Sequence, residues 1–242
     1  MNLLFKTEQA KREYLSTRIK RFYPTFQNGG QIFRDLITQN KNTTAVILDA
    51  GCGDGGVLTQ YKNQFQKLIG VDNNLDLLTN NSHLDEKIHA DLSSIPLPDT
   101  CIDLVISDFV LEHIQNPESV FQEIYRILKP SGVFLFRTTN VYNPVMWLSK
   151  LLPLFLHKTL REKILKKQEE THETFYRANT WSTLVHHGKK SGFSSTQLFR
   201  AGNPEYLSFS PITVVPALLF ERCFDLPKCA WLKMYLIGHY KK

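Results

Sequence analysis

The amino-acid sequence predicts an α/β fold built on a mostly parallel sheet, with helices on both faces of that sheet. Five short apolar segments alternate with helical segments between residues 45 and 138, which is typical of β-α-β units. Acidic and hydroxyl residues follow these segments, at the points where the strands are expected to end. Because right-handed crossovers bring the carboxyl ends of parallel strands to one edge, we expect a ligand to bind at that edge.

Helices are expected before the first strand. Residues 7–38 have the pattern of one or two helices, with breaks at Phe22-Tyr23-Pro24 and at Asn28-Gly29-Gly30. The five apolar segments are then expected to form strands at 45–50, 67–72, 86–90, 102–107 and 133–138.

Beyond Asn140 the alternation stops. Residues 143–170 are expected to form an inserted helical pair, apolar at first and basic later. A further helix, capped by Asn179 or Thr180, is expected to end near Ser191-Gly192. The remaining elements are expected to be a strand over 193–199, an apolar excursion over 204–227 and a last strand over 231–237.

Length and composition indicate a globular chain with a sizeable core. The chain has 242 residues, of which 42% are apolar and 21% charged. Its four cysteines show no C-x-x-C spacing and no accompanying histidine ladder, so we expect neither a metal site nor a disulfide scaffold. Charges from Glu8 onward interrupt any signal-peptide core, and no apolar run reaches the ~20 residues that cross a bilayer. We therefore expect a cytoplasmic protein, with peripheral membrane contact as the alternative.

The net charge of +6 allows an RNA or a membrane surface as a partner. Lysine and arginine are spread through the chain and no RNA-module signature is present, so no nucleic-acid partner is expected. The one local concentration consists of Lys158, Arg161, Lys163, Lys166 and Lys167.

The first expected strand ends at Asp49 and runs into a glycine-rich turn at residues 51–56. Gly51, Gly53 and Gly56 have the spacing of a dinucleotide-binding turn, and Asp72 follows Gly53 by 19 residues, where a ribose-binding acid would lie. Carboxylates at Asp49 and within the turn would, however, repel a pyrophosphate. A ligand with an ammonium and a sulfonium group, such as S-adenosylmethionine, would benefit from the same acids.

This turn, Asp49-Ala-Gly-Cys-Gly-Asp-Gly, resembles the first motif of the class I S-adenosylmethionine-dependent methyltransferases, in particular small-molecule enzymes of the type 11 group. Three segments follow in the order typical of that family: 68–74, then 90–99, then a helix, turn and strand within 121–136. The resemblance covers residues 40 to 140 and implies a Rossmann-like, seven-stranded sheet with an antiparallel last strand and helical lids. We expect one domain over 1–242, with N-terminal helices over 1–40, a cofactor-binding core over 41–140, and lid or substrate insertions over 141–179 and 204–227.

The resemblance also implies roles for residues at the sheet edge. Asp49 and the turn would hold the methionine moiety, Asp72 the ribose and Asp91 the adenine. In plain structural terms, Asp72 could instead cap a helix, Asp91 could cap a turn before Ser93, and Cys52 could simply fill the turn. The full expected cofactor set is Asp49, Gly51, Cys52, Gly53, Asp54, Gly55, Asp72, Asn73, Asp91, Leu92, Asp108 and Phe109.

Two histidines are candidate general bases, because an imidazole titrates near neutral pH. His113 follows the fourth strand, and His172 lies before the helix that leads to the sixth strand. Tyr176 and Arg177, close to His172, are candidate substrate contacts; both could equally belong to an ordinary polar loop. The segment at Asp108 does not read [Asp/Asn]-Pro-Pro-[Tyr/Phe], which weakens an assignment to adenine or glutamine methylation.

The resemblance implies transfer of a methyl group from S-adenosylmethionine, and we expect a small or lipid-linked metabolite as acceptor, methylated at oxygen. The apolar stretches at 143–156 and 205–220 either pack on each other or meet an apolar substrate or a membrane surface. Four alternatives stay open: a quinone or isoprenoid methyltransferase at the membrane face, a sugar methyltransferase, a cofactor-binding protein without transfer activity, and an NAD-dependent enzyme.

Overall fold

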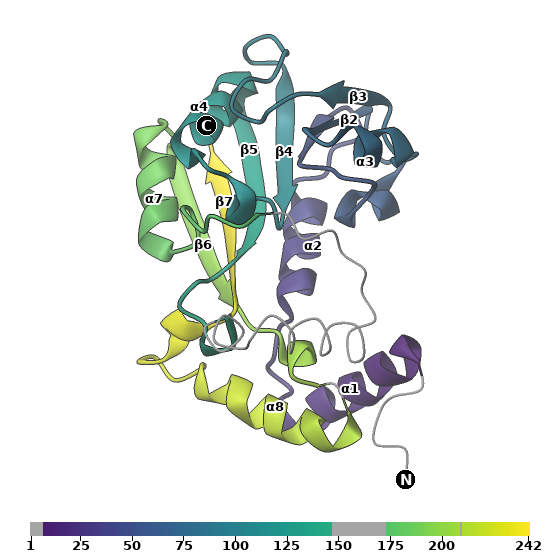
Figure 1. The fold of residues 1–242 in the computed structure, drawn as a ribbon, viewed down its shortest axis with the longest axis vertical. Coiled ribbons are helices and arrows are strands. Elements are labelled where there is room, and N and C mark those ends of the chain that lie inside the picture. Colours follow the sequence, from purple (N-terminus) through teal and green to yellow (C-terminus); the bar gives the residue numbers. More distant parts are fainter. Residues whose placement is uncertain (1–6, 147–172, 209) are drawn as a thin grey trace. The chain divides into compact units, whose positions relative to one another are not determined.

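The computed structural model describes residues 7–146, 173–208 and 210–242, and the chain divides into two compact units (Figure 1). The helical unit comprises residues 1–29, 140–172 and 200–235, and the sheet unit comprises residues 30–139, 173–199 and 236–242. His172, the basic segment at 158–167 and most of the expected helical pair lie outside the described residues.

A seven-stranded sheet in the order β3-β2-β1-β4-β5-β7-β6 confirms the predicted fold class. Strands β1 to β5 pair in parallel with their neighbours. β7 is antiparallel to β5, because the Lys242 N–H donates to the Gly132 carbonyl at one end, and the Asn140 N–H donates to the Met234 carbonyl at the other. The strands are β1 (Val46–Ala50), β2 (Lys67–Asp72), β3 (Glu86–His89), β4 (Ile102–Asp108), β5 (Leu128–Thr139), β6 (Ser195–Ala201) and β7 (Tyr235–Lys241).

Three strand predictions need correction. β6 lies at Ser195–Ala201, two residues beyond the expected range of 193–199. β5 begins at Leu128, five residues before the expected start, because residues 129–132 form an irregularity inside the strand, with a register shift against β4 and Ser131 at φ 67°. The last strand begins at Tyr235, and Trp231 lies instead in a short 3-10 helix, Ala230–Leu232.

The helices begin and end at the residues that the sequence marks. α1 ends at Phe22, where the first break was expected, and α2 begins within the second break. Thr180 caps α7, since its hydroxyl accepts the Thr183 N–H, and Gly192 beyond the helix takes φ 100°. The α-helices are α1 (Glu8–Phe22), α2 (Gly29–Gln39), α3 (Leu75–Asn80), α4 (Pro117–Ile127), α7 (Trp181–Lys190) and α8 (Pro211–Cys223).

The core of the sheet unit lies between the sheet and α4. α4 buries Val120, Phe121, Ile124 and Ile127, whose spacing puts them on one face of the helix. The Phe121 ring packs against aromatic rings of β5 and β7, with centroids 5.6 to 6.3 Å away.

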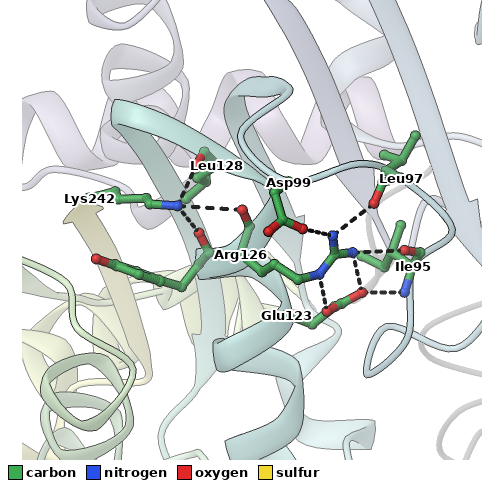
Figure 2. Close-up of polar contacts among 8 residues, drawn as sticks. Ile95, Leu97, Asp99, Glu123, Arg126, Leu128 and Lys242 are labelled. Atoms are coloured by element: carbon green, nitrogen blue, oxygen red, sulfur yellow. Dashed lines mark hydrogen bonds and ion pairs between the residues drawn. The ribbon is translucent and has the colours of Figure 1, made fainter.

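Polar residues of the segment 123–132, which is part of the stretch that resembles the methyltransferase family, stabilise the fold. Figure 2 shows the Arg126 guanidinium bound to Glu123 and Asp99 and to the carbonyls of Ile95 and Leu97, at 2.5 to 3.0 Å. The Lys242 ammonium donates to main-chain carbonyls at the end of α4, including that of Leu128 at 2.8 Å. These contacts anchor the loop before β4 and satisfy carbonyls that the helix leaves unpaired.

The helical unit has a smaller core of its own. α1 and α8 pack against each other through Leu15, Tyr23, Val214 and Leu218, all of which are buried. Arg222 of α8 donates to the Phe22 carbonyl at the end of α1. This pair of helices is therefore held by apolar burial with polar contacts at one end.

Candidate ligand site at the carboxyl edge of the sheet

The glycine turn after β1 adopts a backbone that side-chain-bearing residues rarely take. Gly51, Gly53 and Gly55 have φ values of 79°, 49° and 143°, whereas Gly56 is extended. A Cβ on Gly51 would lie 2.4 Å from Val110, but a Cβ on Gly53 would meet nothing within 4 Å. The turn thus packs tightly behind Gly51 and is open beside Gly53.

The element that follows the turn does not suit a dinucleotide. Residues Val57–Tyr61 form a five-residue 3-10 helix where a pyrophosphate-binding turn would lead into an α-helix. The hypothesis of an NAD-dependent enzyme is already weakened by Asp49 and Asp54, and the absence of an α-helix directly after the turn weakens it further.

Asp72 and Asn81 hold the turn in place. One carboxylate oxygen of Asp72 accepts the Gly53 N–H, and the other accepts the Asn74 N–H, both at 2.8 Å. The buried amide of Asn81 donates to the carbonyls of Cys52 and Gly53 at 3.4 and 3.1 Å. Asn81 was not among the predicted residues, because its role depends on a contact 28 residues away in the chain.

Asp49, at the end of β1, is a buried carboxyl among other carboxyls. Burial, reinforced by the charges of Asp108 and Asp72, raises its pKa to about 7. Within the described residues, the Asp49 carboxyl has no hydrogen-bond donor and no cationic partner. This edge of the sheet therefore favours a ligand group that carries positive charge.

Asp108 differs from Asp49 because it has a dedicated partner. The Arg137 guanidinium of β5 binds both Asp108 oxygens, at 2.7 and 2.8 Å. The same guanidinium lies 4.4 Å from the centre of the Phe109 ring. Phe109 has φ 59°, which is strained for an aromatic residue. Asp108 and Phe109 thus form a rigid corner at the end of β4.

A buried polar network joins β5 to the segment at 173–179. The Thr138 hydroxyl donates to Glu112 at 2.8 Å and accepts from the Asn179 amide at 2.6 Å. The Glu112 carbonyl in turn accepts the N–H groups of Phe175 and Tyr176. Burial raises the Glu112 pKa to about 7, while its own backbone and Thr138 pull it down. Glu112 was not among the predicted residues, because Thr138, Phe175 and Tyr176 are brought next to it only by the fold.

His113 and Tyr176 both adjoin this network: His113 follows Glu112 in the chain, and the Tyr176 N–H donates to the Glu112 carbonyl. The Nδ1 of His113 lies 2.8 Å from the Glu173 carbonyl, so in the neutral ring Nδ1 carries the proton and Nε2 is the basic nitrogen. Tyr176 has φ 54° and is half-buried. Arg177 is exposed and donates to the Gln115 carbonyl at 2.9 Å.

The remaining residues of the predicted cofactor set either have a local structural role or are exposed. Asp91 is exposed and accepts the backbone and side-chain donors of Ser93 at 2.7 and 2.5 Å, which is the turn-capping arrangement. Leu92 is part of the core, and Asn73 and Asp54 are exposed. Cys52 is buried with a raised thiol pKa, mainly through burial, as expected of a residue that fills the turn.

Known proteins share this part of the chain. Residues 48–136 match the family model of the methyltransferase domain. A probable S-adenosylmethionine-dependent methyltransferase of Mycolicibacterium smegmatis is 31% identical over 97 residues, which are 39% of this chain and 38% of that protein. A malonyl-[acyl-carrier protein] O-methyltransferase of Enterobacter lignolyticus is 32% identical over 97 residues, 39% of each chain. The chain therefore spans about two fifths of the length of these relatives.

Solved structures share the fold over a longer stretch. A S-adenosylmethionine-dependent methyltransferase from Archaeoglobus fulgidus superposes with a TM-score of 0.55 at 18% identity, over 96% of this chain and 94% of that one. Similarity at this identity supports the Rossmann-like fold.

Proposed function

Because the chain belongs to the class I S-adenosylmethionine-dependent methyltransferase family, we propose that it transfers a methyl group from S-adenosylmethionine to a small or lipid-linked metabolite. The observation that carries the proposal is Asp49, a buried carboxyl with a raised pKa and, among the described residues, no cation beside it. A buried carboxyl of this kind is stabilised when a cationic ligand binds next to it.

The residues present fit this cofactor. S-adenosylmethionine carries an ammonium and a sulfonium group, and when bound it supplies an electrophilic methyl group. Asp49 would partner the positive charge, and the open side of Gly53 leaves space beside the turn. Each oxygen of Asp72 accepts one N–H and keeps a lone pair for a ribose hydroxyl. Asp91 would have to give up or share its bonds with Ser93 to contact the adenine.

The protein's own contribution is to orient the acceptor and to move its proton. An acceptor hydroxyl loses a proton during methylation, and His113, whose Nδ1 lies 2.8 Å from the Glu173 carbonyl, would take it at Nε2. Glu112 and Thr138 hold the backbone that presents His113 and Tyr176, which favours alignment of a bound acceptor. An acceptor that is already a carboxylate would need no base. The resemblance to an O-methyltransferase supports oxygen as the acceptor atom.

Calorimetry with S-adenosylmethionine tests the cofactor site. Asp49→Asn should weaken binding about 10- to 100-fold, the equivalent of one charged interaction of ~1.5–3 kcal/mol. Asp76→Asn, which removes an exposed carboxyl from α3, is the matched control and should change the affinity less than twofold. Equal affinities of the wild type and a folded Asp49→Asn protein would overturn the site.

The transfer reaction is tested separately with S-adenosylmethionine labelled in the methyl group, incubated with a cell extract and then partitioned. Label in the organic phase would identify a lipid-linked acceptor, and label in the ribonuclease-resistant aqueous phase would identify a polar one. Tight cofactor binding without label in any fraction would reject the activity while leaving the cofactor site intact.

A further inference from the structure

Helix α8 presents an apolar face to solvent. Ile212, Pro216, Leu219, Phe220 and Cys223 are all exposed, and their spacing of four, three, one and three residues places them on one side of the helix. More than half of the Ile212 and Leu219 surfaces is accessible. The apolar surface continues past the helix with Leu226 and Trp231, which are 59% and 49% exposed.

The opposite side of α8 is buried and contains the helix's only acid. Val214, Ala217, Leu218 and Glu221 face the interior of the helical unit. Glu221 is 4% exposed, one of its carboxylate oxygens has no hydrogen-bond partner within the described residues, and its carboxyl fills the space beside the Gly202 backbone. A helix adapted to water would place Glu221 outside and Leu219 or Phe220 inside. α8 has the reverse arrangement.

Positive charge is concentrated in the helical unit, the unit that contains α8. Among the described residues, the helical unit holds nine lysines and arginines against five acids, and the sheet unit holds thirteen against fifteen. The net charges of these residues are therefore +4 and −2. Five of the cations lie on α1, the helix that packs against α8, and Arg222 and Lys228 are exposed beside the apolar face.

Of the nine large apolar side chains that are markedly exposed in the described part of the chain, seven belong to the helical unit. Apolar exposure and positive charge thus coincide in the same unit. That combination is the one by which an amphipathic helix binds an anionic lipid surface.

We propose that α8 lies in the headgroup region of an anionic membrane, with its Ile212–Phe220 face among the acyl chains and the neighbouring cations at the phosphate level. α8 has 13 residues and is about 20 Å long at 1.5 Å per residue, too short for a hydrocarbon core of about 30 Å. No helix within the described residues is long and apolar enough to span a bilayer. The helix therefore binds parallel to the surface. This inference does not depend on the methyl-transfer activity.

Vesicle sedimentation with the full chain tests the proposal. The wild type should sediment with vesicles of phosphatidylcholine and phosphatidylglycerol, and the bound fraction should fall when phosphatidylglycerol is omitted or salt is raised. Leu219→Glu should reduce the apparent affinity on the order of tenfold or more, through lost apolar contact and added repulsion. Leu75→Glu is the matched control: Leu75 is equally exposed, at 55%, but belongs to α3 of the sheet unit, so binding should not change.

Circular dichroism would check that both variants are folded. Calorimetry would measure their affinity for S-adenosylmethionine as an independent test of the cofactor site. A folded wild type that does not sediment with anionic vesicles would overturn the proposal. So would equal loss of binding in Leu219→Glu and Leu75→Glu. A change from dimer to monomer in Leu219→Glu, without vesicle binding by the wild type, would assign the face to contact between two copies and would also overturn it.

Discussion

Asp49 is held in a state that opposes folding and favours binding. Its carboxyl is buried beside two other carboxyls, and no cation of the described chain neutralises it. An unfolded aspartate ionises near pH 4, whereas folded Asp49 ionises near 7. Between these values the folded state keeps a proton that the unfolded state has lost, so a rise in pH destabilises the fold. Above pH 7 this effect levels off.

Asp49→Asn should therefore stabilise the protein while it weakens cofactor binding. The gain in free energy of unfolding should grow by about 2–3 kcal/mol between pH 5 and pH 8, since one pKa unit corresponds to about 1.4 kcal/mol. Urea denaturation of both proteins at the two pH values measures this difference. A gain that is the same at pH 5 and pH 8 would contradict the raised pKa.

The positions of site residues could be predicted where their contacts are local in the chain, but not where the contacts are tertiary. Asp49 and the glycines follow from one segment, and the structure places them as expected at the end of β1. Asn81 and Glu112 act through partners that lie 26 to 29 residues away, which only the folded sheet brings near. Asp91 was open between two roles: its bonds to Ser93 show that it caps the turn, and its contact with the adenine stays a prediction.

Among elements, the junction of β5 with the segment at 173–179 has the Thr138 hydroxyl at its centre. Thr138 is fully buried and bonds two other buried polar groups. Thr138→Val keeps the shape but removes one hydrogen-bond partner from Glu112 and one from Asn179, whose amide keeps its bond to the Thr139 carbonyl. The free energy of unfolding should therefore fall by about 2 kcal/mol. Thr139→Val is the control, since Thr139 is only partly buried and its hydroxyl lies 3.4 Å from the Asn179 amide. A similar loss in both variants, measured by urea denaturation, would show that the network has no special role.

The strands also show which elements sequence can predict. The ranges of β1 and β2 agree with prediction to within a residue, because parallel strands that are buried on both faces are continuous apolar runs. The start of β5 was missed because Lys129-Pro130-Ser131-Gly132 has the composition of a turn. In the structure these four residues form a bulge within β5, since Leu128 before them still pairs with Ile102 of β4.

At the scale of the whole molecule, the two units should respond to different ligands. S-adenosylmethionine at 100 times its Kd stabilises a binding fold by about 2.7 kcal/mol. Hydrogen exchange should therefore slow at residues 49–56 and 72–81 when the cofactor is added, and in α8 when anionic vesicles are added. Slower exchange in α8 with the cofactor alone would instead support the prediction that residues 204–227 form a lid over the site.

Cys52 illustrates a problem that a cofactor of this kind creates for its host. A methylating sulfonium reacts with thiolates, so a cysteine in the turn beside it risks alkylation of the protein itself. The thiol of Cys52 is directed at the Gly70 backbone, where a Cβ would lie 2.8 Å from its sulfur, and burial keeps its pKa far above the usual range. The turn thus uses sulfur as a small apolar filler and keeps it protonated, which protects it from alkylation by a bound sulfonium.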